Sequence, residues 1–410
     1  MFNIEEIRLD FPMLNNKRMQ NHQLIYLDNA ATTLKPQCVI DAVVDYYSNL
    51  GANAHRGDYE LSYMVDTAFE ETRKEVAKFI NAKEDEICFT SGASEALNTV
   101  AVGYGQNLLK EGDIILSAES EHASSVLPWM RCAKETKAIM KYIPLDKEGR
   151  ITLDNVKAMM NDKVKIVAIA QVSNVLGYVT PIKEITELVH SYGAKIVVDG
   201  AQSVPHQPID VKDMDIDFLA FSAHKMCGPT GVGVLYGKYK LLEATQPLLL
   251  GGGSNARFEM CGNIQLKKPP FKFETGTPNI EGVIGFGAAI KYLNKIGMNN
   301  IHQREKELHQ YAIQQLKQLN NVHIYNEHCE AAIITFNINN IFAQDVATFF
   351  NANGLALRSG QHCAKMLIEK LETSATLRAS IYFYNTKEEI DELVKLCKNA
   401  TMENCLNVFF

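Results

Sequence analysis

The strongest constraint on the fold of this chain is a regular alternation of short apolar runs with helix-like segments, between about residue 85 and residue 240. Each run is rich in apolar residues and ends in or near Gly, Ser or Asp. This alternation is typical of βαβ units around a mostly parallel sheet, and unbroken Val, Ile and Leu indicate strands buried on both faces. We therefore predict an α/β fold. The expected strands are Ile87–Thr90, Ile114–Ser117, Ile166–Gln171, Lys195–Asp199, Phe218–Ser222 and Gly233–Tyr236.

A second set of elements follows a helix-like stretch from Glu281 to about Gln318. Its runs are shorter and alternate more between apolar and polar residues, as in a small α+β domain packed on one side of a larger one. A final amphipathic helix is expected from Lys387 to about Ala400. The expected strands of this set are Val322–Tyr325, Ala331–Asn337, Leu355–Arg358 and Thr376–Tyr384.

These two sets predict two domains, for which 410 residues are sufficient. We expect a large domain over residues 21–291 and a small C-terminal domain over residues 292–410. An N-terminal segment, residues 1–20, is expected to pack with the small domain.

Charge and composition argue against several classes of function. The net charge of -7 provides no basic field for a nucleic acid, so no nucleic-acid partner is expected. No apolar run reaches the roughly 20 residues of a membrane helix, and the first residues do not resemble a targeting segment. The nine scattered cysteines form no C-x-x-C pair. We expect a cytoplasmic protein with no membrane contact and no metal site.

Polar residues that follow the apolar runs are the candidate site residues, because ligands of an open α/β sheet collect beyond the carboxyl ends of its strands. Ala93 and Ser94 follow one strand and open a helix, where a backbone N–H and a hydroxyl can meet an anion. Ser94 and Glu95 equally fit an ordinary helix start. Asp199 and Gln202 follow another strand. A carboxylate there can keep the pyridine nitrogen of a cofactor protonated, or it can cap the next helix.

The run Ser222-Ala223-His224-Lys225 ends a third strand with a hydroxyl, an imidazole and an amine. A partly buried Lys225 near cationic groups would have a lowered pKa, which makes it a nucleophile that forms Schiff bases and a usable general base. The alternative is a surface lysine, which is the rule for this residue type. The strand end and the following Gly228-Pro229 favour the first interpretation.

Cys363 lies on the short polar stretch Gly360-Gln361-His362-Cys363. Loops carry functional residues and the thiolate is the reactive form, so this cysteine is the candidate nucleophile. Arg358 and His362 are expected to favour the thiolate. Packing is the better interpretation for the remaining cysteines, which are Cys38, Cys88, Cys132, Cys227, Cys261, Cys329, Cys397 and Cys405.

Together these motifs resemble those of group II, SufS-type cysteine desulfurases, which are class V, fold-type-I pyridoxal-phosphate enzymes. The resemblance covers nearly the whole chain. It implies a large domain with a mostly parallel seven-stranded sheet, a smaller α+β domain that carries the cysteine loop, and pyridoxal 5'-phosphate as cofactor. The matching segments are Tyr26–Thr33, Ala54–Gly57, Glu121–Trp129, Gln171–Asn174, Asp199–Gln202, Phe273–Asn279 and Arg358–Cys363.

The resemblance also implies roles for individual residues. Cys363, Lys225 and His122 are the implied catalytic residues, with His122 stacked on the cofactor ring. The implied cofactor contacts are Lys225, Asp199, Gln202, His122, Ala93, Ser94, Ser222, His224, Asn174 and, from a partner subunit, Thr277. The implied substrate contacts are Arg378, Asn174, Arg358, His55 and Ala30. From the residues alone, His122 also fits a core histidine, Thr277 a turn and Arg378 a surface ion pair.

The implied reaction converts L-cysteine to L-alanine and leaves sulfur as a persulfide on Cys363. The implied partners are a second copy of the chain and a SufE-like or SufU-like acceptor that feeds iron–sulfur cluster assembly. Selenocysteine lyase, cysteine sulfinate desulfinase and a kynureninase-like lyase remain alternatives on the same scaffold. A non-catalytic interaction protein or a nucleotide-binding protein is the alternative from another class, although no glycine-rich nucleotide motif follows a strand.

Overall fold

The computed structural model describes residues 3–15, 22–54 and 57–409. Its centre is a seven-stranded sheet with the order β2-β8-β7-β6-β5-β3-β4. β8 runs antiparallel to both of its neighbours, and the other neighbouring strands are parallel. The expected large sheet is therefore present. Its strands are β2 (Ile87–Thr90), β3 (Ile114–Ala118), β4 (Ile139–Ile143), β5 (Val164–Ala170), β6 (Lys195–Asp199), β7 (Phe218–Ser222) and β8 (Gly233–Gly237).

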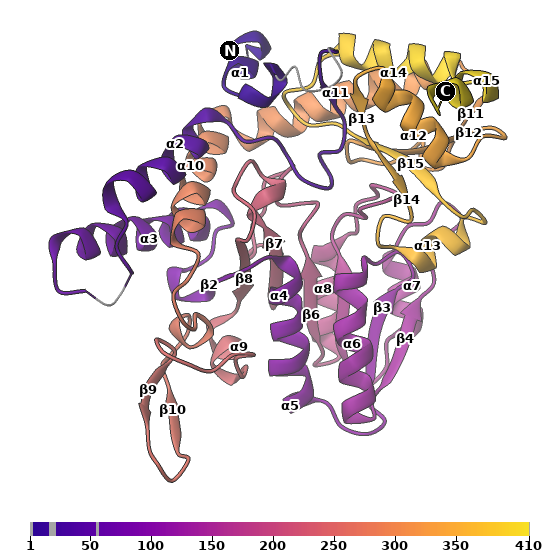
Figure 1. The fold of residues 1–410 in the computed structure, drawn as a ribbon. Coiled ribbons are helices and arrows are strands. Elements are labelled where there is room, and N and C mark those ends of the chain that lie inside the picture. The colour runs from indigo at the N-terminus through magenta and orange to yellow at the C-terminus, as the bar shows by residue number, and fades with distance from the viewer. Residues whose placement is uncertain (1–2, 16–21, 55–56, 410) are drawn as a thin grey trace.

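Alternate residues of these strands enter two separate hydrophobic clusters, as the two faces of a pleated sheet require. Ile115 and Ile166 pack with Trp129 on one face, whereas Leu116 and Val167 belong to the cluster on the other face. Helices α4 (Ala93–Asn98) and α6 (Ala123–Thr136) pack together in front of the sheet in the view of Figure 1. Burial on both faces explains why these strands are unbroken apolar runs in the sequence.

A smaller four-stranded antiparallel sheet, of order β11-β12-β15-β14, lies beyond the large one at the upper right of Figure 1. A parallel pair joins β1 to β13, and a projecting hairpin pairs β9 with β10. These strands are β1 (Ile25–Tyr26), β9 (Asn255–Phe258), β10 (Ile264–Leu266), β11 (Val322–Ile324), β12 (Ile333–Ile338), β13 (Leu355–Ala356), β14 (Arg358–Gly360) and β15 (Thr376–Ser380).

Local signals in the sequence set several helix ends. α14 begins with a capping box in which Thr386 and Glu389 bond each other's backbone N–H groups. The helix-like stretch after residue 280 is two helices, because Gly297, with φ of 90°, separates α10 from α11. Apart from α4 and α6, the helices have the following bounds: α1 (Ile4–Leu9), α2 (Gln37–Asp45), α3 (Glu60–Phe79), α5 (Gln106–Leu108), α7 (Leu153–Met159), α8 (Ile182–Ser191), α9 (Tyr239–Ala244), α10 (Ile280–Ile296), α11 (Met298–Leu316), α12 (Ala343–Ala352), α13 (Lys365–Lys370), α14 (Lys387–Asn399) and α15 (Met402–Leu406).

The observed strands differ from the expected ones at three places. β4 was not expected, because it is an edge strand with half-exposed side chains rather than an apolar run. The expected strand Leu355–Arg358 is divided between β13 and β14, which pair with different partners. The expected strand Thr376–Tyr384 ends at Ser380, after which Asn385 turns the chain by accepting the Tyr382 N–H.

The N-terminal residues lie against the C-terminal part of the chain. Arg8 forms an ion pair with Glu389 at 2.8 Å and donates to the Tyr384 carbonyl. The Phe11 ring lies 4.6 Å from that of Tyr384. Residues 1–2 and 16–20 lie outside the described residues, and the packing of residues 1–20 with the small domain stays a prediction. The predicted domain boundary at residue 291 falls within α10, which is continuous, and it stays a prediction.

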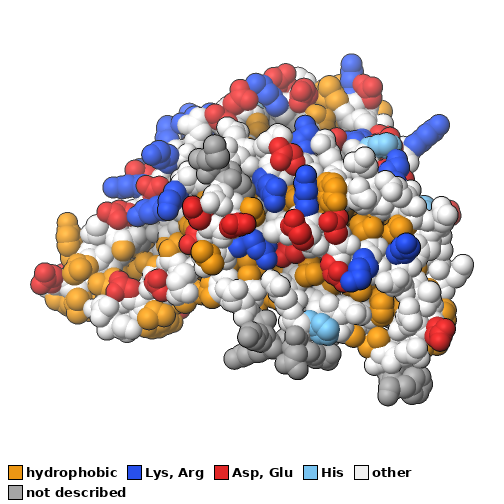
Figure 2. Space-filling view, turned by 90° about the horizontal axis from the view of Figure 1, so that it is seen from above, with side chains coloured by type: hydrophobic (Ala, Val, Ile, Leu, Met, Phe, Trp, Pro, Cys, Tyr) orange, Lys and Arg blue, Asp and Glu red, His pale blue; other side chains and the backbone are white. Residues whose placement is uncertain are grey.

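The surface carries no large field of one sign on the face seen in Figure 2, where acidic and basic side chains are interspersed. Within residues 3–15, 22–54 and 57–409, no helix has both the length and the apolar character needed to cross a membrane.

Candidate active site

A cavity of about 220 Å³ lies beyond the carboxyl ends of the central strands and is closed on one side by residues of the small sheet. It brings together almost all of the predicted site residues. The predicted residues that line it are Ala30, Ala93, Ser94, His122, Asn174, Asp199, Gln202, Ser222, His224, Lys225, Arg358, Cys363 and Arg378. Ser124 and His362 also line it without having been assigned contacts there.

Strand topology explains this convergence. Asp199 is the last residue of β6 and Ser222 the last of β7. His122 follows β3, and Asn174 follows β5. β2 runs in the same direction as β7, because β8 is antiparallel to both, so Ala93 emerges at the same edge. Parallel strands therefore deliver residues far apart in sequence to one crevice.

Lys225 lies in a short turn of 3-10 helix after β7. Burial is the main cause that lowers the pKa of its amine to about 8, and the neighbouring Asp199 carboxylate opposes this shift. The interpretation as an ordinary surface lysine is thus wrong. Burial also lowers the pKa of His224 to about 4, with help from the charges of Lys225 and Lys35, so this imidazole is neutral at neutral pH.

The peptide that precedes Lys225 is held tightly. The carbonyl oxygen of His224 accepts from the Thr33 N–H at 3.0 Å, the Thr32 hydroxyl at 2.9 Å and the Lys35 amine at 3.0 Å. This residue pattern was not singled out from the sequence. It fixes the backbone from which the reactive amine extends into the cavity.

Asp199 and Gln202 lie together on the floor of the cavity. Asp199 Oδ1 accepts the Ala201 N–H at 2.9 Å, so the carboxylate caps the following turn and still borders the cavity. The Gln202 amide donates to the Ala30 carbonyl at 2.8 Å, and its Oε1 is buried without a partner among the described residues. A buried orphan acceptor of this kind indicates a missing ligand or water.

His122 is the N-cap residue of α6. Its Nδ1 accepts the Ser124 N–H at 3.1 Å, which assigns the ring proton of the neutral imidazole to Nε2. Burial, followed by the charge of Lys225, lowers its pKa. His122 is therefore a neutral ring with a donor, and its alternative interpretation as a core histidine is not supported because the ring lines the cavity.

Small hydroxyls gather at the end of the cavity next to α4. The Ala93 N–H donates to Ser222 Oγ at 2.8 Å, and the hydroxyls of Ser94 and Ser124 are 2.7 Å apart. Such a set suits a phosphate. Thr277 lies elsewhere in the same chain, in a pocket that it shares with Ser91, and His55 lies outside the described residues.

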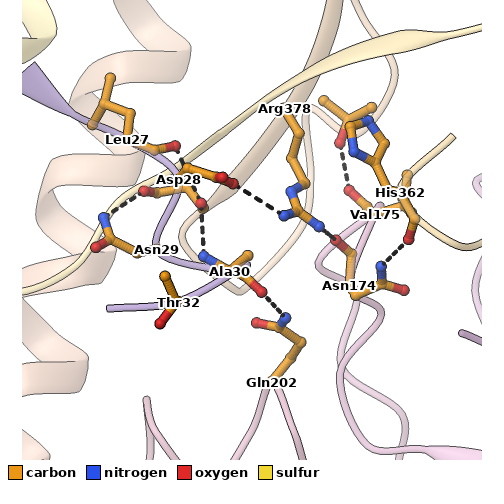
Figure 3. A network of polar contacts seen from close by, with 12 residues as sticks. Leu27, Asp28, Asn29, Ala30, Thr32, Asn174, Val175, Gln202, His362 and Arg378 are labelled. Atoms are coloured by element: carbon orange, nitrogen blue, oxygen red, sulfur yellow. Dashed lines mark hydrogen bonds and ion pairs between the residues drawn. The ribbon is translucent and has the colours of Figure 1, made fainter. Parts of the chain in front are cut away.

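Arg378 lies on β15 and is 2% exposed, so the interpretation as a surface ion pair is wrong. Figure 3 shows its guanidinium between two partners, with Nη1 donating to the Asn174 carbonyl at 2.8 Å and Nη2 lying 3.4 Å from Asp28 Oδ1. Its Nε is buried without a partner among the described residues. Burial lowers the pKa of Arg378 to about 10, and the group remains a cation at neutral pH.

Cys363 is exposed and lies on the cavity wall. Both His362 and Cys363 have left-handed backbones, with φ of 51° and 57°. Such conformations cost on the order of 1–3 kcal/mol each and persist where surrounding contacts impose them. The Cys363 carbonyl accepts the Ala123 N–H at 2.8 Å, and the His362 carbonyl accepts from the Asn174 amide at 2.8 Å.

His362 carries no positive charge with which to favour the Cys363 thiolate, although the sequence led us to expect this role of it. Its ring is buried against Thr376, and burial lowers its pKa to about 3, so it is neutral. Arg358 and Arg378 remain as cationic residues of the cavity wall.

The other cysteines divide into two groups. Six are buried as expected, and burial raises the pKa of Cys227 to about 12. Cys38 and Cys261 are exposed, so the packing interpretation is wrong for these two. Cys261 lies in the turn of the β9–β10 hairpin, away from the cavity.

The residues of the cavity fit pyridoxal 5'-phosphate. An amine with a lowered pKa lies beside a strand-end carboxylate, the orphaned Gln202 oxygen indicates a missing partner, and the serine hydroxyls form a phosphate cradle. No group of His, Cys, Asp and Glu that could hold a metal ion occurs among the residues that the structure describes.

Comparison with known proteins agrees with this site. The aminotransferase class-V family model matches residues 25–393. A probable cysteine desulfurase of Halalkalibacterium halodurans is 46% identical over 399 residues, which cover 96% of this chain and 97% of that one.

Two solved structures are also similar. The cysteine desulfurase CsdA from Escherichia coli is 34% identical with a TM-score of 0.90, covering 100% of this chain and 99% of its own. A cysteine desulfurase from Thermococcus onnurineus NA1 is 38% identical with a TM-score of 0.91, covering 96% of this chain and 97% of its own. This chain therefore belongs to the aminotransferase class-V family of pyridoxal-phosphate enzymes and, within it, to the cysteine desulfurases.

Proposed function

We propose that this enzyme takes sulfur from L-cysteine, releases L-alanine and carries the sulfur as a persulfide on Cys363. One observation carries the proposal. The exposed Cys363 thiol, the Lys225 amine and the buried Arg378 guanidinium border the same cavity, although they come from three separate segments. Relatives that bear the name cysteine desulfurase over nearly the whole length support it.

The cofactor would be held by Ser94, Ser222 and Asp199, and when bound it supplies an electron-withdrawing ring that accommodates the negative charge left at the substrate α-carbon. Lys225 Nζ takes the α-proton. With a pKa of about 8, a useful fraction of this amine is unprotonated near neutral pH. His122 delivers a proton through Nε2 in this proposal.

Arg378 binds the substrate carboxylate. Its planar fork suits two carboxylate oxygens, and burial strengthens the attraction because water does not screen it. Arg358, Asn174, Ala30 and His55 complete the proposed substrate contacts, although His55 lies outside the described residues.

The Cys363 thiolate then attacks the substrate sulfur. A new S–S bond forms while the bond between sulfur and Cβ breaks, and the electron pair of that bond stays with the carbon skeleton. Protonation of this carbon completes alanine. The enzyme retains the Cys363 persulfide, which an acceptor has to remove before the next turnover, so ping-pong kinetics are expected.

The proposal extends to the surroundings of the enzyme. A SufE-like or SufU-like protein would accept sulfur from the exposed Cys363 for iron–sulfur cluster assembly in the cytoplasm. A homodimer would bring Thr277 of one subunit to the phosphate of the other. The position of Thr277 outside its own chain's cavity is compatible with that role.

Release of alanine from L-cysteine by the wild type and by Cys363→Ala tests the reaction. Both proteins are supplied with a reducing thiol as sulfur acceptor and checked for bound cofactor. We expect at least about a hundredfold loss in the variant, because it lacks the nucleophile. Equal rates would sink the proposal and favour a lyase that acts on selenocysteine or cysteine sulfinate without this thiol.

A further inference from the structure

Asn174 lies between the substrate arginine and the cysteine loop, defined here as residues 360–363, and bonds to both (Figure 3). Its backbone carbonyl accepts from Arg378 Nη1 at 2.8 Å. Its side-chain amide donates to the carbonyl of His362 at 2.8 Å. The next residue along the chain is Cys363, so two hydrogen bonds separate the guanidinium from the backbone of the nucleophile.

The segment that carries Asn174 is itself rigid. It follows β5 and forms a tight turn in which Ser173 Oγ accepts the Leu176 N–H at 3.1 Å and Ser173 O accepts the Gly177 N–H at 3.0 Å. Asn174 is 7% exposed. Its amide is therefore held in place by the large sheet and presents a fixed donor to the cysteine loop.

The cysteine loop needs such contacts to keep its shape. His362 and Cys363 are consecutive left-handed residues with side chains, a conformation that a free chain rarely holds. The Gln361 carbonyl accepts the N–H of Ala364, the next residue after the loop. From other segments, the Ala123 N–H donates to the Cys363 carbonyl and the Asn174 amide donates to the His362 carbonyl. Removing the Asn174 donor would leave the His362 carbonyl free to turn.

We infer that Asn174 is a positioning residue, which holds the cysteine loop in its left-handed form and makes the position of Cys363 depend on the state of Arg378. This inference rests on the proposed function for the roles of Arg378 and Cys363. It follows that a ligand carboxylate that competes for Arg378 Nη1 would loosen the contact between Asn174 and the loop.

The accessibility of the Cys363 thiol to alkylation measures this positioning. The holoenzyme is treated with iodoacetamide, and the modified Cys363 peptide is quantified by mass spectrometry, which separates it from the exposed Cys38 and Cys261. Rates are compared at pH values where they have levelled off, so that ionisation of the thiol no longer limits them. The pH profile thereby separates access from thiol acidity.

Asn174→Asp replaces the donor by an acceptor of the same shape, and Asn174→Ala removes it. We expect the rate of Cys363 alkylation at the high-pH plateau to rise about fivefold or more in both variants, because a freed loop exposes its thiol more often. Asn155→Ala is the matched control, since it removes a similar bond from an exposed amide to the Pro144 carbonyl. It should alkylate at the wild-type rate. Equal rates in the wild type and Asn174→Asp would overturn the inference.

A double-mutant cycle tests the dependence on Arg378. Arg378→Met alone should raise the levelled rate, because the carbonyl of Asn174 loses its donor. In the Asn174→Ala background, the same change should add little. Independent, multiplying effects would contradict a connection through Asn174. If Asn174→Ala does not retain cofactor and a normal melting transition, the cycle is run with Asn174→Asp.

Alkylation requires no turnover, so the two hypotheses fail separately. A wild type that makes no alanine from L-cysteine would refute the proposed function, whatever the labelling shows. If the wild type releases alanine normally and the Asn174 variants are labelled at the wild-type rate, the positioning role alone is refuted.

Discussion

The floor of the cavity consists of residues that follow buried parallel strands, whereas the cysteine loop that faces it follows the short strand β14 and has left-handed backbone at His362 and Cys363. On the floor, Asp199 and Lys225 have positions fixed by the central sheet and by bonds to the backbone around them. The loop is held by a few contacts from other segments. Under the proposed function, proton transfer takes place on a rigid base, whereas the proposed sulfur carrier lies on a backbone that can be released.

The largest effect is expected from removal of the Lys225 amine on the floor of the cavity. We expect Lys225→Ala to lower alanine formation by about a thousandfold or more, since it removes both the cofactor anchor and the base. At neutral pH the cofactor-free variant should melt at the wild-type temperature or somewhat above it, because burial disfavours the charged form of the Lys225 amine and the substitution removes that cost. Alanine release and thermal melting check the two parts. A variant that retains its activity would show that the floor does not perform the proton transfer.

A second change tests Arg378, which is linked to the cysteine loop through Asn174. Arg378→Lys keeps a positive charge but loses the planar fork, so we expect kcat/KM for L-cysteine to fall about a hundredfold, mainly through KM. Steady-state kinetics measure this loss. Arg131→Lys, an exposed surface pair, is the matched control and should have no effect. An unchanged KM would exclude Arg378 from carboxylate binding.

The pH dependence of the floor gives a smaller and more specific effect. In the cofactor-free protein, the rate at which Lys225 reacts with an aldehyde should rise with pH and level off above about 8, because only the neutral amine reacts. Asp199 raises the pKa of Lys225, so Asp199→Asn should move the profile to lower pH. A profile that levels off only near the ordinary lysine value would contradict the burial of this amine. A shift to higher pH in Asp199→Asn would contradict the influence of the Asp199 carboxylate on it.

The smallest expected effect concerns the anchor of the loop. Thr376→Val removes the hydroxyl that lies 2.9 Å from His362 Nε2 and should cost about 1 kcal/mol of unfolding free energy. Cys363 should become easier to alkylate, while the reaction of Lys225 with an aldehyde stays the same. Denaturant unfolding and peptide labelling measure these changes. Thr348→Val removes a hydroxyl that bonds the Gln344 carbonyl within α12, away from the cysteine loop, and should leave the alkylation of Cys363 unchanged.

The contrast between the cavity floor and the cysteine loop also explains which parts of the structure can be predicted from the sequence. Strands β6 and β7 have the expected ends because buried parallel strands leave a local signature of apolar residues that stop at Ser or Asp. The motif at Lys225 is local for the same reason. β2 is an edge strand that pairs antiparallel with β8, and its ends are as expected because its side chains are also largely buried. β4 leaves no such signature, because its side chains, unlike those of the other edge strand β2, are mostly half-exposed or exposed.

Contacts between distant segments are not encoded in any local pattern. Arg378 fits a surface ion pair in isolation, and only the packing of β15 against residues near Asp28 and Asn174 buries it. The neutral state of His362 likewise depends on Thr376 and on burial. The family resemblance supplied the role of Arg378, and its connection to the cysteine loop through Asn174 is visible only in the folded structure.

The most direct test of sulfur transfer to Cys363 is a single turnover without any sulfur acceptor. The holoenzyme is mixed with L-cysteine, alanine is counted, and the Cys363 peptide is weighed by mass spectrometry. We predict that each Cys363 gains the mass of one sulfur atom for each alanine released. Alanine formed while the mass of the Cys363 peptide stays unchanged would contradict the assignment of Cys363 as the sulfur carrier.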